Sequence, residues 1–301
     1  MPAPVPSGYT RGSILFLARG LDPYGEERLF QHFWETSGAY GSRIVLVPTG
    51  PSAWEQAQQL AGRFQEWESD TVDVLQVTCR EDALRTELLD VIGQATAILL
   101  LGDHPLKLAT FLGGTPLAQA IRRANARGKV VAGHGAGAAL LCEHMIAFDT
   151  QAVRARESPV PFLHRHRIQL SPGLGITNRV VLDSTSSTVG EGWDRLARLL
   201  EAVAYNPFLV GLALERDTGA VIYPDNTLEI IGRHSALLVD AAEMTHTNIS
   251  AYRDPSPLSI LGLRLHALGP GYTYRLQERT AHPPPPSDIP DQGVPEWAGE
   301  G

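Results

Sequence analysis

Three glycines at alternate positions mark the stretch of this sequence that is best suited to chemistry. Gly133, Gly135 and Gly137 follow a short β-branched run, and a helix-compatible stretch covers residues 138–146. A strand, a sharp turn and a helix in this order form the elbow on which hydrolases with a parallel sheet carry a serine or cysteine nucleophile. Here the residue at the apex is Gly135, which has no reactive side chain.

The same glycines could instead bind a phosphate group, as in dinucleotide-binding turns. Such turns read G-x-G-x-x-G after the first strand and have an acidic residue about 20 positions further on. The glycines of this chain read G-x-G-x-G, follow the fifth expected strand and have no such acidic residue. We therefore expect no nucleotide and no other cofactor.

Histidine and cysteine spacing does not predict a metal site. The chain has ten histidines, but His164 and His166 lack the spacing of a helical pair of metal ligands, and neither Cys79 nor Cys142 lies in a C-x-x-C motif. We expect Cys142 to be a small buried side chain on the helix after the elbow, and not a nucleophile.

Charge and composition argue against several classes of function. The 301 residues carry a formal net charge of −8, which argues against a nucleic-acid-binding surface. No apolar run approaches the roughly 20 residues of a membrane span, and the two cysteines fit a reducing compartment. The sequence predicts a cytoplasmic protein without a nucleic-acid or membrane partner.

The elements that must position the elbow alternate between strands and helices. Apolar runs predict strands, and amphipathic stretches between them predict helices. The expected strands cover residues 13–18, 43–48, 72–77, 96–101 and 129–132, and the expected helices cover residues 26–37, 52–67, 81–95 and 116–127. Such alternation implies a parallel sheet with helices on both faces. Ligands bind such sheets at the carboxyl ends of the strands, so we expect a site in the loops after Ala18, Pro48, Leu101 and Ala132.

The pattern changes after residue 148. A helix is expected at 193–205, and short strands are expected at 180–182, 210–214, 219–223, 227–231, 236–239, 260–265 and 272–276. We expect these strands to extend the same sheet or to cap it with antiparallel pieces, in one α/β domain over residues 12–279. Residues 1–11 are expected to form a flexible leader, and residues 280–301 a Pro-rich disordered tail.

Taken together, these runs resemble a known family. The chain resembles cyanophycinase, a serine exopeptidase with the class I glutamine amidotransferase-like fold, from about Ser13 to Leu276. The resemblance rests on Arg43-Ile-Val-Leu-Val-Pro-Thr49, on Ala132-Gly-His-Gly-Ala-Gly-Ala-Ala139, and on residues 114–122, 143–146, 173–175, 198–204, 217–218 and 260–266. It implies an α/β three-layer sandwich with a parallel-centred sheet, and a homodimer. It also implies cleavage of cyanophycin, an aspartate backbone that bears arginines, into β-aspartyl-arginine dipeptides.

The chain departs from this family where the chemistry would lie. The family elbow reads Gly-Thr-Ser-Ala-Gly-Ala, and the matching run has Gly135 at the serine nucleophile. Anchoring the next motif at Asp183 places Thr185 at the histidine base, and the family's Asp-Glu-Asp-Thr motif places Arg216 at the glutamate. Acyl transfer needs a nucleophile, a base and an orienting carboxylate, and none of the three positions supplies its part.

Other positions of the family site are kept in part, since the family's Gly-Gly-Asp-Gln turn reads Leu101-Gly102-Asp103-His104 in this chain. The resemblance implies substrate binding by Asp103 and His104, which match the end of the family's Gly-Gly-Asp-Gln turn. It implies the same for Asp183, Arg195 and Arg198.

Three side chains are candidate substitutes for the lost acid–base groups, namely His104, His134 and Glu215. A water molecule would then replace the serine. The sequence thus supports three interpretations. The leading one is a catalytically inactive relative, a pseudoenzyme, that binds an acidic or arginine-bearing peptide or regulates a partner. The others are an active hydrolase of cyanophycin-like or β-aspartyl peptides with a rearranged site, and a structural partner subunit.

Overall fold

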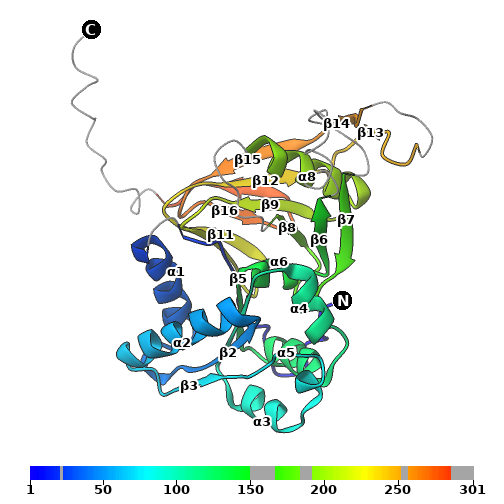
Figure 1. Ribbon diagram of the computed structural model, residues 1–301. Coiled ribbons are helices and arrows are strands. Elements are labelled where there is room, and N and C mark those ends of the chain that lie inside the picture. The colour runs from blue at the N-terminus through cyan, green and yellow to red at the C-terminus, as the bar shows by residue number, and fades with distance from the viewer. Residues whose placement is uncertain (21–22, 150–166, 184–191, 252–256, 286–301) are drawn as a thin grey trace.

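The computed structural model describes residues 1–20, 23–149, 167–183, 192–251 and 257–285. Its largest element is a nine-stranded mixed sheet (Figure 1). Across this sheet the strands are β17 (Thr280–His282), β16 (Thr273–Arg275), β11 (Thr227–Gly232), β10 (Thr218–Ile222), β1 (Ile14–Leu17), β5 (Val130–Gly135), β4 (Ala97–Gly102), β2 (Arg43–Thr49) and β3 (Thr71–Val74). The last five pair in parallel, and the first four join them through antiparallel pairs.

Helices cover both faces of the parallel half, as the alternating sequence pattern predicted. On one face lie α1 (Pro23–Thr36) and α2 (Pro51–Glu66), where Phe33 and Phe64 pack on Leu99 of β4. On the other face lie α3 (Glu87–Gln94), α4 (Pro105–Leu112), α5 (Pro116–Ala126) and α6 (Ala136–Leu140). Every residue of β4 is buried, which agrees with its unbroken apolar run, because a strand covered on both faces needs no polar side.

A second sheet packs against the antiparallel half of the first. Its strands are β15 (Arg264–Leu268), β12 (Ala236–Asp240), β9 (Val210–Leu214) and β8 (Val180–Asp183). Helix α8 (Gly192–Tyr205) covers its outer face, where Leu199 and Val203 pack on Val181 and Val239. The later strands therefore follow both expectations, since some extend the large sheet and others form a separate layer over it.

The helix expected at 138–146 is much shorter in the structure. Helix α6 ends at Leu140, and strand β6 (His144–Asp149) pairs with β7 (Ile168–Pro172). The carbonyls of Leu140, Leu141 and Cys142 accept hydrogen bonds from the backbone of residues 174–176, at 2.7, 2.8 and 3.1 Å. Those carbonyls are thus bound by a distant segment, and the helix does not continue.

Two other expected elements are divided. The stretch 81–95 forms a 3₁₀ turn, η2 (Asp82–Leu84), and then α3, because Arg85 between them has an extended backbone. The strand expected at 260–265 breaks at Gly262, where φ is +81°. It becomes β14 (Ile260–Leu261), which pairs with β13 (His246–Thr247), and β15. A short 3₁₀ turn, η1 (Ala39–Gly41), precedes β2.

Both ends of the described chain contact the domain. The amino group of Met1 lies 3.0 Å from Glu143, and Arg11 donates to the carbonyl of Ala3 at 2.6 Å and to the amide oxygen of Asn125 at 3.1 Å. At the other end, β17 forms the edge of the large sheet. The ordered domain therefore continues past residue 280, where the tail was expected to begin.

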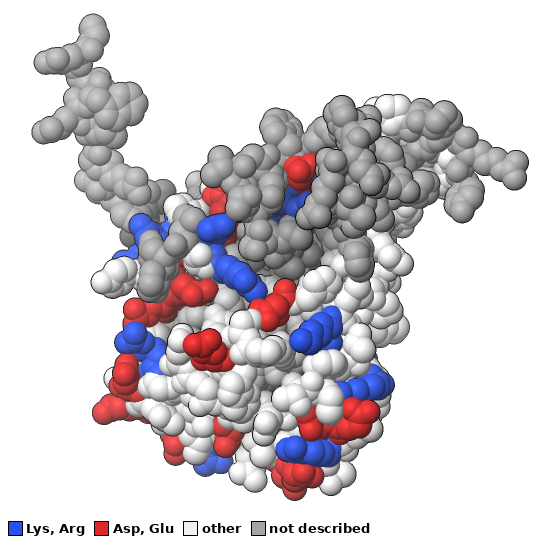
Figure 2. Space-filling view, viewed as in Figure 1, with Lys and Arg blue, Asp and Glu red and all other residues white. Residues whose placement is uncertain are grey.

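Charge is mixed on the face shown in Figure 2. Over the lower half of that view, acidic and basic side chains are interspersed without a broad area of one sign. Within the described ranges, no helix combines the length and the apolar composition that crossing a bilayer requires.

Candidate functional site

The turn between β5 and α6 has the backbone geometry of a nucleophile elbow. Gly135 has φ 56° and ψ −117°, and α6 begins at the next residue. For a residue with a side chain this conformation costs on the order of 1–3 kcal/mol, whereas glycine adopts it freely. The tight turn expected at Gly135 is therefore present, and without a side chain.

Three polar side chains meet around Gly135 at the carboxyl ends of the parallel strands. They are Arg19 after β1, Ser52 after β2 and Asp103 after β4. Nη2 of Arg19 lies 3.5 Å from Oδ1 of Asp103, and the hydroxyl of Ser52 donates to Oδ2 of Asp103. The ammonium group of Lys107 lies at the same edge. Nζ of Lys107 and Oδ2 of Asp103 lie 3.4 and 3.3 Å from the point where a Cβ on Gly50 would stand. This cluster lies at the strand ends where the sequence indicated a site.

The guanidinium group of Arg19 lies next to the point where a side chain on Gly135 would begin. Its Nε lies 3.0 Å from the point where a Cβ on Gly135 would stand. A guanidinium stays protonated in proteins, so Arg19 cannot attack a carbonyl. Sequence reasoning missed this residue, although the loop after Ala18 was among the places where a site was expected.

His134 points away from this cluster. Its Nε2 lies 2.7 Å from Oε1 of Glu26 on α1, and its Nδ1 lies 3.3 Å from the amide nitrogen of Gln56 on α2. The ring packs 5.2 Å from that of Phe30 and is nearly fully buried. Successive strand residues face opposite sides of a sheet, which places His134 under α1 and α2.

The environment of Glu26 favours its charged form. Burial alone would raise the pKa of this carboxyl group, but the contact with His134 and the amide of Gly20 at 3.2 Å lower the pKa below its ordinary value of 4.5. The ionised carboxylate therefore helps to hold α1 on the sheet.

We expect Glu26→Gln to lower the free energy of unfolding at pH 7 by about 1–3 kcal/mol, the usual contribution of a hydrogen bond to a charged group. Because the pKa of Glu26 is lowered by folding, its contribution is complete above pH 4.5 and is lost as the pH falls through the lowered value. Urea unfolding at pH 7 and at pH 4 would show the difference shrinking. Glu66→Gln, at a carboxylate whose side chain is 67% exposed, is the matched control. A loss that does not depend on pH would contradict this assignment.

The other candidate acid–base residues contact backbone groups close to them. His104 is exposed and is the N-cap residue directly before α4. Its Nδ1 accepts a hydrogen bond from the amide of Leu106 at 3.3 Å. Glu215 accepts one from the amide of Ser235 at 2.8 Å. Among the described contacts none joins His104 to Glu215.

Of the other two positions matched to the family triad, Arg216 is among the described residues and Thr185 is not. Arg216 is half-buried in the turn between β9 and β10, and its carbonyl accepts from the hydroxyl of Thr218 at 3.2 Å. Thr185, matched to the base, lies outside the described residues.

Asp183, Arg195 and Arg198 lie together at the ends of β8 and β9. Nε of Arg198 donates to the carboxylate of Asp183 at 2.7 Å, and the two residues are 5% and 1% exposed. Arg195 donates to the carbonyls of Asp183 at 3.1 Å and Leu214 at 2.7 Å. These contacts join α8 to the second sheet.

The described residues offer neither a metal cluster nor a reactive cysteine at the elbow. No group of three or more His, Cys, Asp or Glu side chains within them is arranged to hold a metal ion. Cys142 is buried, and burial raises the pKa of its thiol to about 12. A thiol with that pKa stays protonated at neutral pH and does not react readily.

Comparisons with known proteins agree with this architecture. A family model described as Peptidase family S51 matches residues 15–231. A cyanophycinase from Geminocystis herdmanii is 31% identical over 281 residues, which cover 92% of this chain and 97% of that protein. A cyanophycinase from Trichormus variabilis is 29% identical over 279 residues, with coverage of 91% and 89%.

A solved structure supports the fold. The crystal structure of a peptidase from an acI-B1 Actinobacterium has a TM-score of 0.56 and 21% identity, over 87% of this chain and 98% of that one. With the family model and the two relatives named above, which are cyanophycinases, this architecture shows that the chain belongs to peptidase family S51.

Proposed function

We propose that this chain is a cyanophycinase-like member of its family that has lost peptidase activity and binds a peptide at the elbow. One observation carries the proposal: the elbow is built, but Gly135 stands at its apex and the guanidinium of Arg19 lies over it. Removing the nucleophile of a serine peptidase costs on the order of a million-fold in turnover. The elbow of this chain lacks that nucleophile.

The position of Arg19 adds a second obstacle to catalysis. A substrate carbonyl must come within about 3–3.5 Å of the attacking atom. Here Arg19 is held near that point by Asp103. A side chain at Gly135 would therefore be crowded by Arg19 in its present position.

The charges at the elbow favour a peptide with groups of both signs. Arg19 and Lys107 can bind carboxylates, and Asp103 can bind a guanidinium or ammonium group. Relatives named cyanophycinase support a ligand of the cyanophycin type, with acidic and arginine groups. Binding at Arg195 and Arg198 would require them to exchange their present partners, so we place the ligand at Arg19, Asp103 and Lys107.

Homodimer formation and cytoplasmic location stay predictions.

The test is incubation of the purified chain with cyanophycin and with β-aspartyl-arginine, with binding and dipeptide release measured separately. We expect binding without release, and weaker binding by Asp103→Asn. Release above background would overturn the proposal. If Ser52→Ala or His104→Ala abolished that release, the chain would be a hydrolase with a rearranged site, for which the Ser52–Asp103 contact is the specific observation. Absence of both binding and release would favour a structural subunit.

We expect Gly135→Ser alone to restore no dipeptide release. The new side chain would adopt a strained backbone conformation, which costs about 1–3 kcal/mol, and its Cβ would stand 3.0 Å from Nε of Arg19. No histidine base contacts this point among the described residues. Thermal unfolding and the release assay together check both expectations. The double variant with Arg19→Ala relieves the crowding but supplies no base. Release by either variant would show that a base is present.

A further inference from the structure

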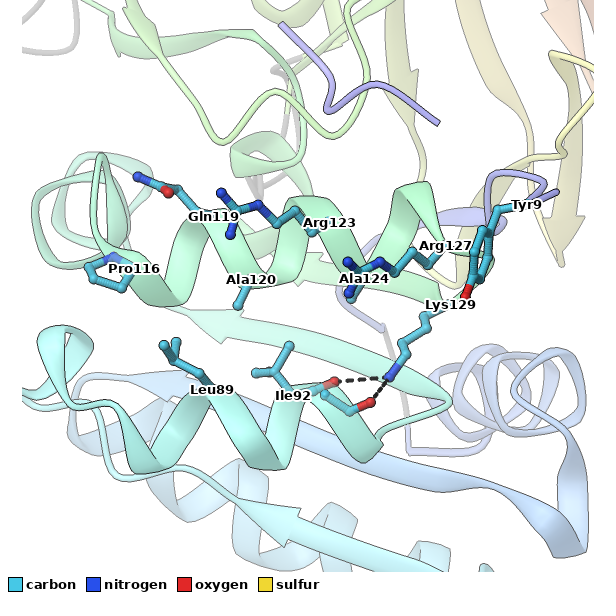
Figure 3. Close-up of a pocket in the computed structure, with 11 residues that line it drawn as sticks. Tyr9, Leu89, Ile92, Pro116, Gln119, Ala120, Arg123, Ala124, Arg127 and Lys129 are labelled. Carbon is cyan, nitrogen blue, oxygen red and sulfur yellow. Dashed lines mark hydrogen bonds between the residues drawn. The ribbon is translucent and has the colours of Figure 1, made fainter. Parts of the chain in front are cut away.

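A hollow of about 430 Å³ lies between α3 and α5, at the other end of the sheet from the elbow (Figure 3). Lys129, which precedes β5, lines the hollow, whereas Gly135 ends the same strand. Six residues of strand span about 20 Å. The hollow is therefore separate from the site described above.

Short side chains create this hollow. Ala120 and Ala124 of α5 face Gly93, at the end of α3, across a gap that longer side chains would fill. Leu89, Ile92 and Pro116 add an apolar lining. The volume of the hollow falls in the range of about 300–1,000 Å³ that is typical of small-molecule sites. Such sites are concave and mostly apolar with a few polar groups.

Three positive side chains border the apolar lining. They are Arg123 in the last turn of α5, Arg127 directly after α5, and Lys129 (Figure 3). Like charges four residues apart on a helix destabilise it. Burial, followed by the charge of Arg127, lowers the pKa of Lys129. Among the described residues no carboxylate forms an ion pair with any of the three. The chain as a whole carries a net charge of −8, so this local excess of positive charge is unlike the rest of it.

Helix ends account for part of this charge. Lys129 donates to the carbonyl of Ile92 at 3.2 Å and to that of Gly93, and so caps α3. Arg123 and Arg127 lie near the C-terminal end of α5, where a cation interacts favourably with the helix dipole by about 0.3–1 kcal/mol. Neither effect requires an apolar hollow beside the cations. The combination of an apolar hollow with cations beside it matches a ligand that has an apolar body and an anionic head.

We propose that the hollow between α3 and α5 binds a small amphipathic anion. The aliphatic body would lie on Ala120, Ala124 and Ile92, and the guanidinium groups of Arg123 and Arg127 would bind the head. The planar guanidinium forms paired hydrogen bonds with carboxylate and phosphate alike. The hollow opens beside Tyr9 of the leader, so a bound molecule would also contact that segment.

The first test uses octanoate as the probe and isothermal titration of the full chain. Acetate has the head without the body, and octylammonium has the body with the opposite charge. We expect octanoate to bind at least about tenfold more tightly than either, a difference of about 1.4 kcal/mol. Octyl phosphate in a parallel titration shows which head is preferred. Failure of octanoate to bind, or equal binding of octylammonium, would overturn the proposal.

The second test locates the site. The double variant Arg123→Gln, Arg127→Gln removes the charges, and Ala120→Leu fills the hollow without changing charge. Each is expected to weaken octanoate binding at least about tenfold, and Arg28→Gln, at an exposed arginine on α1, is expected to leave it unchanged. Circular dichroism and thermal unfolding show which variants are folded, and the charge variant still decides the question if Ala120→Leu does not fold. Octanoate binding that survives the charge variant would exclude this site, whatever the cyanophycin assay gives.

Discussion

Replacing Arg198 with alanine is expected to lower the free energy of unfolding by about 3–5 kcal/mol, the usual cost of leaving one charge of a buried ion pair without its partner. Arg198 and Asp183 are almost completely buried, and Nε of the arginine lies 2.7 Å from the carboxylate. Without Arg198, that buried carboxylate would lose its charged hydrogen-bond donor between α8 and β8. Chemical denaturation of the two proteins at pH 7 measures the difference.

The chain contains a matched control for this variant. Arg43 and Asp70 form an ion pair with nearly the same geometry, 2.8 Å between Nε and Oδ2, but their side chains are 50% and 47% exposed. Exposed pairs contribute about 0–1 kcal/mol, so Arg43→Ala should have little effect. Equal losses in Arg198→Ala and Arg43→Ala would show that burial of the first pair has no consequence.

The Gly137→Ala variant is expected to lose on the order of 3 kcal/mol of stability or more. A Cβ at Gly137 would lie 2.2 Å from the carbonyl oxygen of Leu100 in β4. The obstructing atom belongs to the backbone of a central strand and cannot rotate away, as a side chain could. Because α6 is held against β4 at this point, the variant should also disturb the turn at Gly135. Thermal unfolding measures the loss.

Gly62→Ala is the control for Gly137→Ala. Gly62 lies on the exposed side of α2, and nothing is within 4 Å of a Cβ at that position. Alanine favours a helix interior by about 0.5–1 kcal/mol over glycine, so this variant should be slightly more stable than the natural chain. A similar loss in both variants would mean that close backbone contact at Gly137 is not the cause.

Much of the fold could be predicted from the sequence because its signal is local. The unbroken apolar run of β4 can be read within that segment alone. The helical spacing of apolar residues in α1, α2 and α5 can likewise be read within each helix. For the helix expected at 138–146, a distant segment decided the outcome. Residues 174–176 bind the carbonyls that would have continued α6, and their approach leaves no periodic signal in the sequence of the helix.

The candidate site also has one part that local sequence predicts and another that only the fold brings together. Gly135 was found from spacing alone, because alternate glycines after a strand predict a tight turn. Arg19 was not found, because nothing in its own neighbourhood connects it with Gly135. The parallel pairing of β1 with β5, in which Leu17 lies opposite His134, brings the two together. His134 directly precedes Gly135 and was a candidate acid–base group, but its side chain packs under α1 and α2.

The sequence by itself determined that Gly135, at the apex of the elbow, has no side chain, since the identity of a residue does not depend on folding. It also determined the α/β class, because periodicity is a property of short segments. The tertiary structure alone decided that a guanidinium lies next to the apex, that Asp183 and Arg198 pair with one another, and that three cations border an apolar hollow on the far side. Each of these depends on the register of strands and the packing of helices that are distant in the chain.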